Sequence, residues 1–280
     1  MSQSSWSTII TPQSSLVSIN TKEIFSYRDL LWLFVKRDIV TIYKQTILGP
    51  IWYFLQPVLT TGMFTFVFGR LANISTDGAP HVVFYLLGVT IWNYFSECLT
   101  KTSNTFVANQ GIFGKVYFPR VIVPASLVIS GLGKFLIQFL LFLGVLSYYF
   151  ARGQVAPNWV ALLTPFIVFV MAVISLGFGM VFSSMTTKYR DLAFLLNFGV
   201  QLWMYATPVI YPISTIPKEY VKFINLNPIT PLVETMRYGF LGVGDLSSSG
   251  IIYSFSFGVV IFFLGFFIFN KVEKTFLDTV

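Results

Sequence analysis

Apolar stretches long enough to cross a membrane recur six times along this chain, and short polar segments separate them. A helix needs roughly 20 apolar residues to cross the ~30 Å hydrocarbon core of a bilayer. Because that core offers no water to backbone N–H and C=O groups, each stretch predicts a helix. The six predicted transmembrane helices cover residues 51–68, 82–99, 127–150, 160–183, 192–212 and 251–270. The pattern therefore predicts an all-α polytopic membrane protein.

The segment before the first span is polar at its start and amphipathic afterwards. Residues 1–25 are rich in Ser and Thr and predict a flexible tail. Residues 26–48 predict a helix with Ser26 as its N-cap, and they carry Lys36 and Arg37 among apolar positions. So many charges do not suit a span, but they suit an amphipathic helix at the membrane interface. The alternative is a helix of a soluble domain, for which the chain offers no other residues.

Two short helices are predicted between the fifth and sixth spans. Residues 217–224 and 231–240 carry apolar side chains but are too short to cross a bilayer. Thr230 precedes Pro231, which is the pattern of an N-cap followed by the first helical residue. We expect an external re-entrant helix pair that is buried against protein. An ordinary amphipathic loop on the outer surface is the open alternative.

The composition indicates one membrane domain without a separate soluble one. Of the 280 residues, 55% are hydrophobic and 10% are charged, whereas a soluble domain carries about 25% charged residues. We expect a single transmembrane domain over residues 1–280. It comprises a six-span bundle over residues 51–270 and a cytoplasmic tail over residues 271–280.

The distribution of basic residues predicts the orientation of the chain. Its net charge of +7 would favour a nucleic-acid partner in a soluble protein. In a membrane protein, however, Lys and Arg gather in the cytoplasmic loops. With the N-terminus inside, 13 of the 18 Lys and Arg residues fall on the cytoplasmic side. Both termini are therefore predicted to be cytoplasmic, and no nucleic-acid partner is expected.

The chain has few residues suited to metal binding or catalysis. Cys98 and His81 are the only residues of their kinds, so we expect no disulfide, metal site or cofactor on this chain. No G-x-x-x-x-G-K-[ST] loop occurs, so we expect no ATP hydrolysis by this chain itself. Only Glu97 and Lys134 bring formal charges into the predicted spans. Lys134 predicts either a channel-lining charge or a snorkelling side chain paired with Glu97, and we favour the second.

Short motifs in chain order resemble those of one family. They are Lys36-Arg37-Asp38 followed by residues 43–52 and Gln56-Pro57, the run KVYFPR at 115–120 with Pro124, KYRD at 188–191, Asn227-Pro228 with Arg237-Tyr238-Gly239, and EKTF at 273–276. In this order, they resemble the membrane (permease) subunits of polysaccharide-export ABC transporters. That family exports O-antigen, capsule or teichoic-acid polymers, and the resemblance covers about residues 27–280.

The resemblance implies a half-transporter. Such a chain pairs with a second copy of itself around a central conduit, and two separate ATPase subunits bind ATP and Mg. The implied cargo is a polyprenyl-linked glycan, handled together with membrane lipid. The implied location is the bacterial plasma membrane, which is the inner membrane in a cell with two.

Amide and aromatic side chains share helical faces on three spans and predict a substrate channel. Sugar rings present C–H faces to aromatic rings and hydroxyl groups to amides, so such faces would hold a polymer weakly and let it slide. The alternative is that these faces pack against lipid or protein, since the chain holds 31 Phe, 14 Tyr and 6 Trp. The predicted channel residues are Tyr53, Gln56, Thr60, Phe64, Tyr85, Trp92, Asn197, Gln201 and Tyr205.

The cytoplasmic connections predict the surface through which ATP binding is coupled to transport. The connection between the second and third spans supplies two aromatic and two basic candidates, and the turn between the fourth and fifth spans supplies the others. The alternative is that the basic residues only retain the loops inside. The predicted coupling residues are Phe113, Lys115, Tyr117, Arg120, Lys188, Arg190 and Asp191.

Two other functions are weighed against polysaccharide export. An ABC exporter of drugs or small lipids shares the same architecture. An integral-membrane enzyme acting on polyprenyl-linked sugars normally needs Asp or Glu clusters that face the substrate. Only Glu97 lies within a predicted span, so the sequence favours transport over catalysis.

Overall fold

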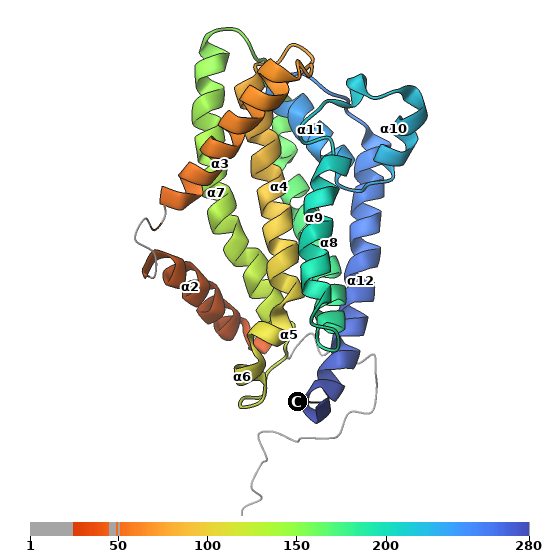
Figure 1. Ribbon diagram of the computed structural model, residues 1–280. Helices are drawn as coiled ribbons and strands as arrows, with labels where there is room; N and C mark the ends of the chain where they lie inside the picture. Colours follow the sequence, from red (N-terminus) through yellow and green to blue (C-terminus); the bar gives the residue numbers. More distant parts are fainter. Residues whose placement is uncertain (1–24, 45–48, 50, 280) are drawn as a thin grey trace, which may run out of the picture.

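The computed structural model describes residues 25–44, 49 and 51–279, and every regular element in these ranges is a helix. Most of the predicted flexible tail, 1–25, lies outside the described residues. The long helices stand side by side as a bundle, and one short helix, α2, lies obliquely beside it (Figure 1). The elements are α2 (Arg28–Lys44), α3 (Ile51–Phe64), η1 (Thr65–Leu71), α4 (His81–Ser103), α5 (Thr105–Ala108), α6 (Gln110–Phe113), α7 (Ile122–Ala151), η2 (Trp159–Leu163), α8 (Thr164–Thr186), α9 (Leu192–Ala206), η3 (Ile213–Thr215), α10 (Lys218–Asn225), α11 (Thr230–Leu241) and α12 (Ser248–Thr279).

In the part of the chain that the structure describes, five helical segments are long and apolar enough to cross a membrane. They are Ile51–Leu71, His81–Ser103, Ile122–Ala151, Trp159–Thr186 and Ser248–Glu273. The exception among the six predicted spans is α9, whose 15 residues extend about 22 Å at 1.5 Å per residue. It ends because Thr207 is extended ahead of Pro208, as the residue before a proline tends to be. The sixth crossing therefore stays a prediction.

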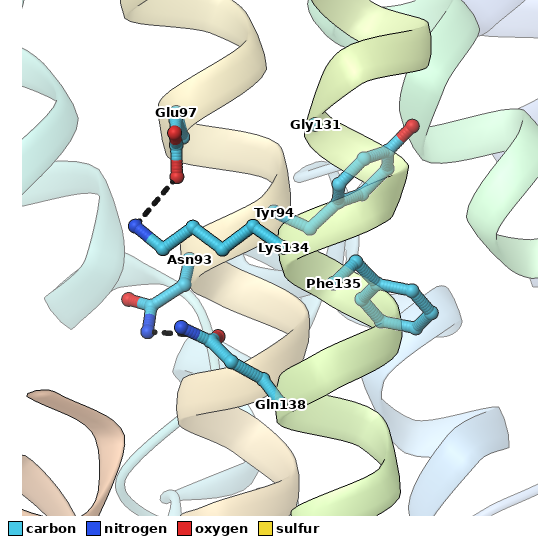
Figure 2. Close-up of a pocket in the computed structure, with 7 residues that line it drawn as sticks. All are labelled: Asn93, Tyr94, Glu97, Gly131, Lys134, Phe135 and Gln138. Carbon is cyan, nitrogen blue, oxygen red and sulfur yellow. Dashed lines mark hydrogen bonds and ion pairs between the residues drawn. The ribbon is translucent and has the colours of Figure 1, made fainter. Parts of the chain in front are cut away.

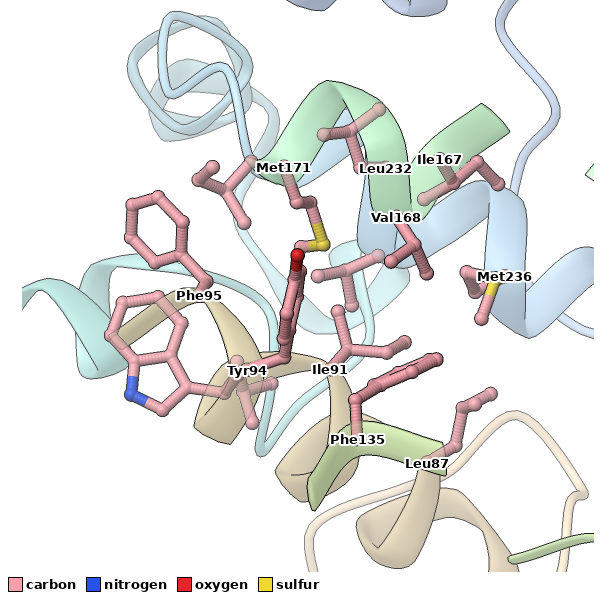
Figure 3. Close-up of a cluster of buried hydrophobic side chains, with 14 of the residues drawn as sticks. Leu87, Ile91, Tyr94, Phe95, Phe135, Ile167, Val168, Met171, Leu232 and Met236 are labelled. Carbon is pink, nitrogen blue, oxygen red and sulfur yellow. The ribbon is translucent and has the colours of Figure 1, made fainter. Parts of the chain in front are cut away.

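The hydrophobic core centres on α4, which is buried on nearly all sides. Side chains of α4 meet those of α7, α8 and α11 in one cluster, in which Leu87, Ile91 and Phe95 come from α4 (Figure 3). The α8 and α12 backbones also approach closely: a Cβ at Gly177 would lie 2.7 Å from the carbonyl carbon of Ile261. Small residues at such crossings allow membrane helices to pack tightly.

The amphipathic helix predicted at 26–48 is observed as α2, and residues 45–48 lie outside the described ranges. Its inner face packs through Phe34 and Val35, which are buried, while Trp32 and Leu33 are exposed. Ile39 reaches Gly133 on α7. The exposed apolar side chains agree with a helix at a membrane surface, but its depth in a bilayer stays a prediction.

Both predicted external helices form, and their environments differ. α11 is almost wholly buried, whereas no residue of α10 is buried and Tyr220 and Phe223 are exposed. The expectation that both would be buried against protein is therefore wrong for α10, whose hydrogen bonds to other elements lie at its C-terminal end. Tyr253 on α12 donates from Oη to the carbonyl oxygen of Leu226 at 2.7 Å. At its C-terminal end, α12 continues as a helix through Thr279, beyond the predicted end of the span at residue 270.

Candidate functional site

A cavity of about 660 Å³ opens between α3, α4, α7 and α9. Most of the side chains around it are amides, hydroxyls or charged groups, although the helices themselves are strongly apolar. Its lining residues are Gln56, Trp92, Asn93, Ser96, Glu97, Thr100, Lys134, Asn197, Val200, Gln201, Met204 and Tyr205.

Two polar pairs join α4 to α7 beside the cavity, and both appear in Figure 2. Asn93, Glu97 and Lys134 line the cavity, whereas Gln138 lies outside its lining. The Lys134 Nζ lies 2.7 Å from the Glu97 Oε2, and the Asn93 Nδ2 donates to the Gln138 Oε1 at 3.3 Å. Asn93 and Glu97 are four residues apart on α4, and Lys134 and Gln138 are four residues apart on α7, so the two pairs join the facing sides of these helices. Lys101 also approaches Glu97, at 2.7 Å. The predicted pairing of Lys134 with Glu97 is therefore observed.

The opposite side of the cavity comes from α3 and α9. Gln56 lies on α3, and Asn197, Gln201 and Tyr205 lie at four-residue spacing on α9, all of them exposed. Trp92 reaches the cavity from α4 and packs against Phe95, with ring centroids 5.4 Å apart. Five predicted channel residues thus meet at one cavity. Their contact with a substrate stays a prediction.

The other predicted channel residues do not line this cavity. Tyr53 lies against Lys134, with Nζ 5.4 Å from the ring centroid. Tyr85 has no exposed surface, and its ring lies 6.2 Å from that of Phe64. The prediction for Tyr85 is wrong, because α3 and the aromatic cluster around α4 cover it. Phe64 forms part of that cover, and Thr60 lies elsewhere on α3.

Trp92 was predicted at the channel from the sequence, but the polar residues of α4 that line the cavity were missed. Asn93, Ser96 and Thr100 line it together with Glu97. Their spacing of three and four residues along the second span was the available pattern, and it places them on one helical face. Within the described ranges, no group of three or more His, Cys, Asp and Glu side chains could hold a metal ion.

The predicted coupling residues divide into exposed and buried sets. Lys115, Lys188, Arg190 and Asp191 are exposed, and 80% of Tyr117 is exposed. They lie in the two connections between α6 and α7 and between α8 and α9. Their position is open to a partner protein.

Phe113 and Arg120 are buried, which corrects the expectation that they face a partner. Phe113 is 3% exposed and lies between Phe106 and Phe118, with ring centroids 5.8 Å away in both cases. Arg120 is 7% exposed and contacts Glu273 on α12. Burial lowers the pKa of Arg120, and the nearby Glu273 carboxylate partly offsets this effect. Both residues serve the internal packing of this end of the bundle.

Comparison with known proteins gives a consistent set of relatives. Residues 29–241 match the ABC-2 type transporter family of membrane proteins. The O-antigen export system permease protein RfbA of Klebsiella pneumoniae is 27% identical over 266 residues, which cover 94% of this chain and 99% of that protein. The protein of the same name from Myxococcus xanthus is 29% identical over 218 residues, covering 77% of this chain and 82% of that protein.

A further relative is the polysialic acid transport protein KpsM of Escherichia coli. It is 21% identical over 248 residues, which cover 87% of this chain and 93% of that protein. The family match extends over well more than half of the chain, and the helical architecture agrees with a multi-pass membrane protein. The chain therefore belongs to the ABC-2 type transporter family of membrane proteins.

Proposed function

We propose that this chain is the transmembrane half-subunit of an ABC exporter that moves a lipid-linked polysaccharide across the plasma membrane. The observation that carries the proposal is the cavity of about 660 Å³, in which Gln56, Asn197 and Gln201 face a space between apolar helices. A polar group left without partners in hydrocarbon costs several kcal/mol, on the order of 2–7. A hydroxyl-rich polymer supplies such partners, while the exposed ring of Tyr205 is offered to its C–H faces.

Three features support this cargo over the alternatives. The lining is mainly neutral and polar, which suits sugars better than hydrophobic drugs or small lipids. The only carboxylate at the cavity, Glu97, is paired with Lys134, so no free acid pair is present there for catalysis on a polyprenyl-linked sugar. The named relatives RfbA and KpsM are permease and transport proteins for O-antigen and polysialic acid.

We propose that a second copy of this chain closes the cavity. Only 11% of the most apolar window of α3 and η1 is buried within one chain. Its Gln56, and the exposed amides Asn197 and Gln201 of α9, would otherwise face hydrocarbon. A homodimer in which these faces turn toward each other would shelter the amides and enclose a central conduit.

We propose that two ATPase subunits bind at the end of the bundle that carries α5 and α6. ABC-2 permeases work with a separate ATPase subunit, and this end exposes apolar and basic side chains together. Ile112, Val116 and Tyr117 are 36%, 60% and 80% exposed, and Lys115 lies among them. Apolar side chains of this kind suit a protein contact better than retention of a loop. With this end in the cytoplasm, both termini are cytoplasmic.

The proposal is tested by removing the chain from its host bacterium. Lipid-linked glycan is then expected to accumulate on the cytoplasmic side of the plasma membrane, while the surface polymer disappears. The wild-type chain restores export only together with its ATPase, and the purified chain alone hydrolyses no ATP. Surface glycan that is unchanged after deletion would exclude this function, and accumulation of a different lipid would favour the small-lipid exporter.

A further inference from the structure

Two family motifs that lie 153 residues apart meet at the cytoplasmic end of the bundle. The Arg120 Nη1 donates to the backbone carbonyl oxygen of Glu273 at 2.7 Å. The backbone N–H of Arg120 donates to the Glu273 Oε1 at 3.4 Å, and the Arg120 Nε lies 3.8 Å from the same oxygen. Arg120 precedes α7, whereas Glu273 lies on α12, beyond the predicted span end at residue 270. The C-terminal end of α12 is thus joined by hydrogen bonds and an ion pair to the connection that follows α6.

Aromatic rings extend this contact from α12 to α5 and α6. Phe269 stacks on Phe106, with ring centroids 4.4 Å apart, and neither ring has exposed surface. Phe113 lies beside Phe106, and the Arg120 guanidinium carbon lies 5.3 Å from the Phe113 ring centroid. Phe269 and Glu273 are four residues apart, so one face of α12 holds both contacts.

The short helices α5 and α6 depend on packing against neighbouring helices for their orientation. α5 and α6 have four residues each, and isolated helices of that length are not stable in water. α8 also holds α5 and the end of α4 that precedes it: the Phe106 N–H donates to the Ser183 Oγ at 3.3 Å, and the Thr186 Oγ1 donates to the Ser103 carbonyl at 3.0 Å. α8 and α12 in turn pack closely at Gly177. The connection therefore rests on two helices that behave as one packed unit.

We propose that Glu273 and Phe269 are positioning residues for coupling. They hold α5, α6 and the following loop in the orientation that meets the ATPase, so that movement of the ATPase is delivered to the α8–α12 pair. This inference rests on the proposed function. It adds that the end of α12, which is not part of the exposed contact surface, determines how much transport each ATP produces.

The test compares Glu273→Gln, Arg120→Gln and the double variant with wild type, all as complexes with the ATPase in proteoliposomes. Glu273→Gln keeps an acceptor for the Arg120 N–H but removes the charge that faces the guanidinium. Phe269→Leu adds a variant of the stacked ring that preserves apolar packing. Lys271→Gln, an exposed position on the same helix, is the matched control. Glycan exported per ATP hydrolysed is measured, together with complex formation by size-exclusion chromatography.

We expect each single variant to form the complex and hydrolyse ATP, with glycan exported per ATP reduced about fivefold, near the lower end of typical coupling between sites. The double variant should be no worse than Arg120→Gln, because Arg120→Gln already removes the ion pair that Glu273→Gln removes. Lys271→Gln should match wild type. A normal ratio in both Glu273→Gln and Phe269→Leu, or complexes that no longer form, would overturn the inference. Failure of the wild-type complex to export glycan would instead count against the proposed function.

Discussion

α3 and α4 are neighbouring helices of similar apolar character, yet they occupy opposite environments. In the most apolar window of each, 11% of α3 with η1 is buried, against 78% of α4. α4 lies between α7, α8 and α11, whereas α3 crosses the edge of the bundle obliquely (Figure 1). Polar groups on α4 such as Asn93 and Glu97 have partners on α7, while Gln56 on α3 is exposed at the cavity. The bundle thus combines a fixed interior with a surface helix that is open to a partner or a substrate.

The N-terminal end of α4 gives the largest expected effect. Arg237 on α11 is fully buried, bonds Glu234 at 2.9 Å and the Val209 carbonyl at 2.8 Å, and lies 3.9 Å from the Phe84 ring centroid. Arg237→Met leaves a carboxylate buried without its partner and should destabilise the fold by about 3–5 kcal/mol. Thermal unfolding in detergent measures this. Arg70→Met, at an exposed position on η1, should stay within about 0.5 kcal/mol of wild type.

The same variant should have a characteristic pH dependence. Burial already raises the pKa of Glu234, and the Arg237 guanidinium opposes that rise. Without the guanidinium the folded-state pKa rises further above its unfolded value. The stability from the protonated carboxyl is then present below the unfolded pKa and is lost as pH rises through the folded one. Arg237→Met should therefore unfold at a higher temperature at pH 5 than at pH 8. Equal destabilisation at both values would show that lost packing dominates.

A pair of glycine substitutions contrasts the two helices directly. A Cβ at Gly88 on α4 would lie 2.7 Å from the backbone carbonyl oxygen of Val209, while a Cβ at Gly62 on α3 meets nothing within 4 Å. Gly88→Ala should destabilise the chain by about 1–3 kcal/mol through overpacking. Gly62→Ala should be neutral or stabilising by up to about 1 kcal/mol, because alanine favours a helix. If both variants unfold alike, α3 is as tightly held as α4.

A smaller effect is expected on transport alone. Gln56→Ala removes one amide from the cavity and should lower glycan export about twofold to tenfold, the range for one hydrogen bond. Val58→Ala, an exposed neighbour on α3 outside the cavity lining, should export normally. Surface polymer and protein level are measured together. Equal export by both variants would place the Gln56 amide outside the path.

Hydrophobic periodicity predicted the helices better than it predicted their surroundings. Five spans follow from apolar length, since hydrocarbon imposes helices whatever the neighbours are. α9 ends early because local backbone geometry at Thr207 and Pro208 overrides an apolar run that continues to residue 212. The bounds of α11 were predicted within one residue at each end from its cap and proline.

The site was less predictable, because a lipid-facing and a protein-facing aromatic residue look alike in sequence. Tyr85 and Phe113 were expected at functional surfaces, and both are buried. The Arg120 contact with Glu273 joins positions 153 residues apart, which no local pattern reveals. By contrast, the spacing of Asn197 and Gln201 on one helical face, where an amide is a clear exception, led to two residues that line the cavity, and their contact with a substrate stays a prediction.

A thiol placed at the cavity tests most directly whether the polar cavity lies on the export path. In a chain with Cys98 replaced by Ala, Gln201→Cys places a thiol at the cavity, and Leu202→Cys places one on an exposed position of α9 outside the lining. Each complex is reconstituted with its ATPase, treated with a bulky polar thiol reagent, and assayed for ATP-driven glycan export. Modification at position 201 should stop export and modification at position 202 should leave it near the untreated rate. Continued export through a chain fully modified at position 201 would contradict the account.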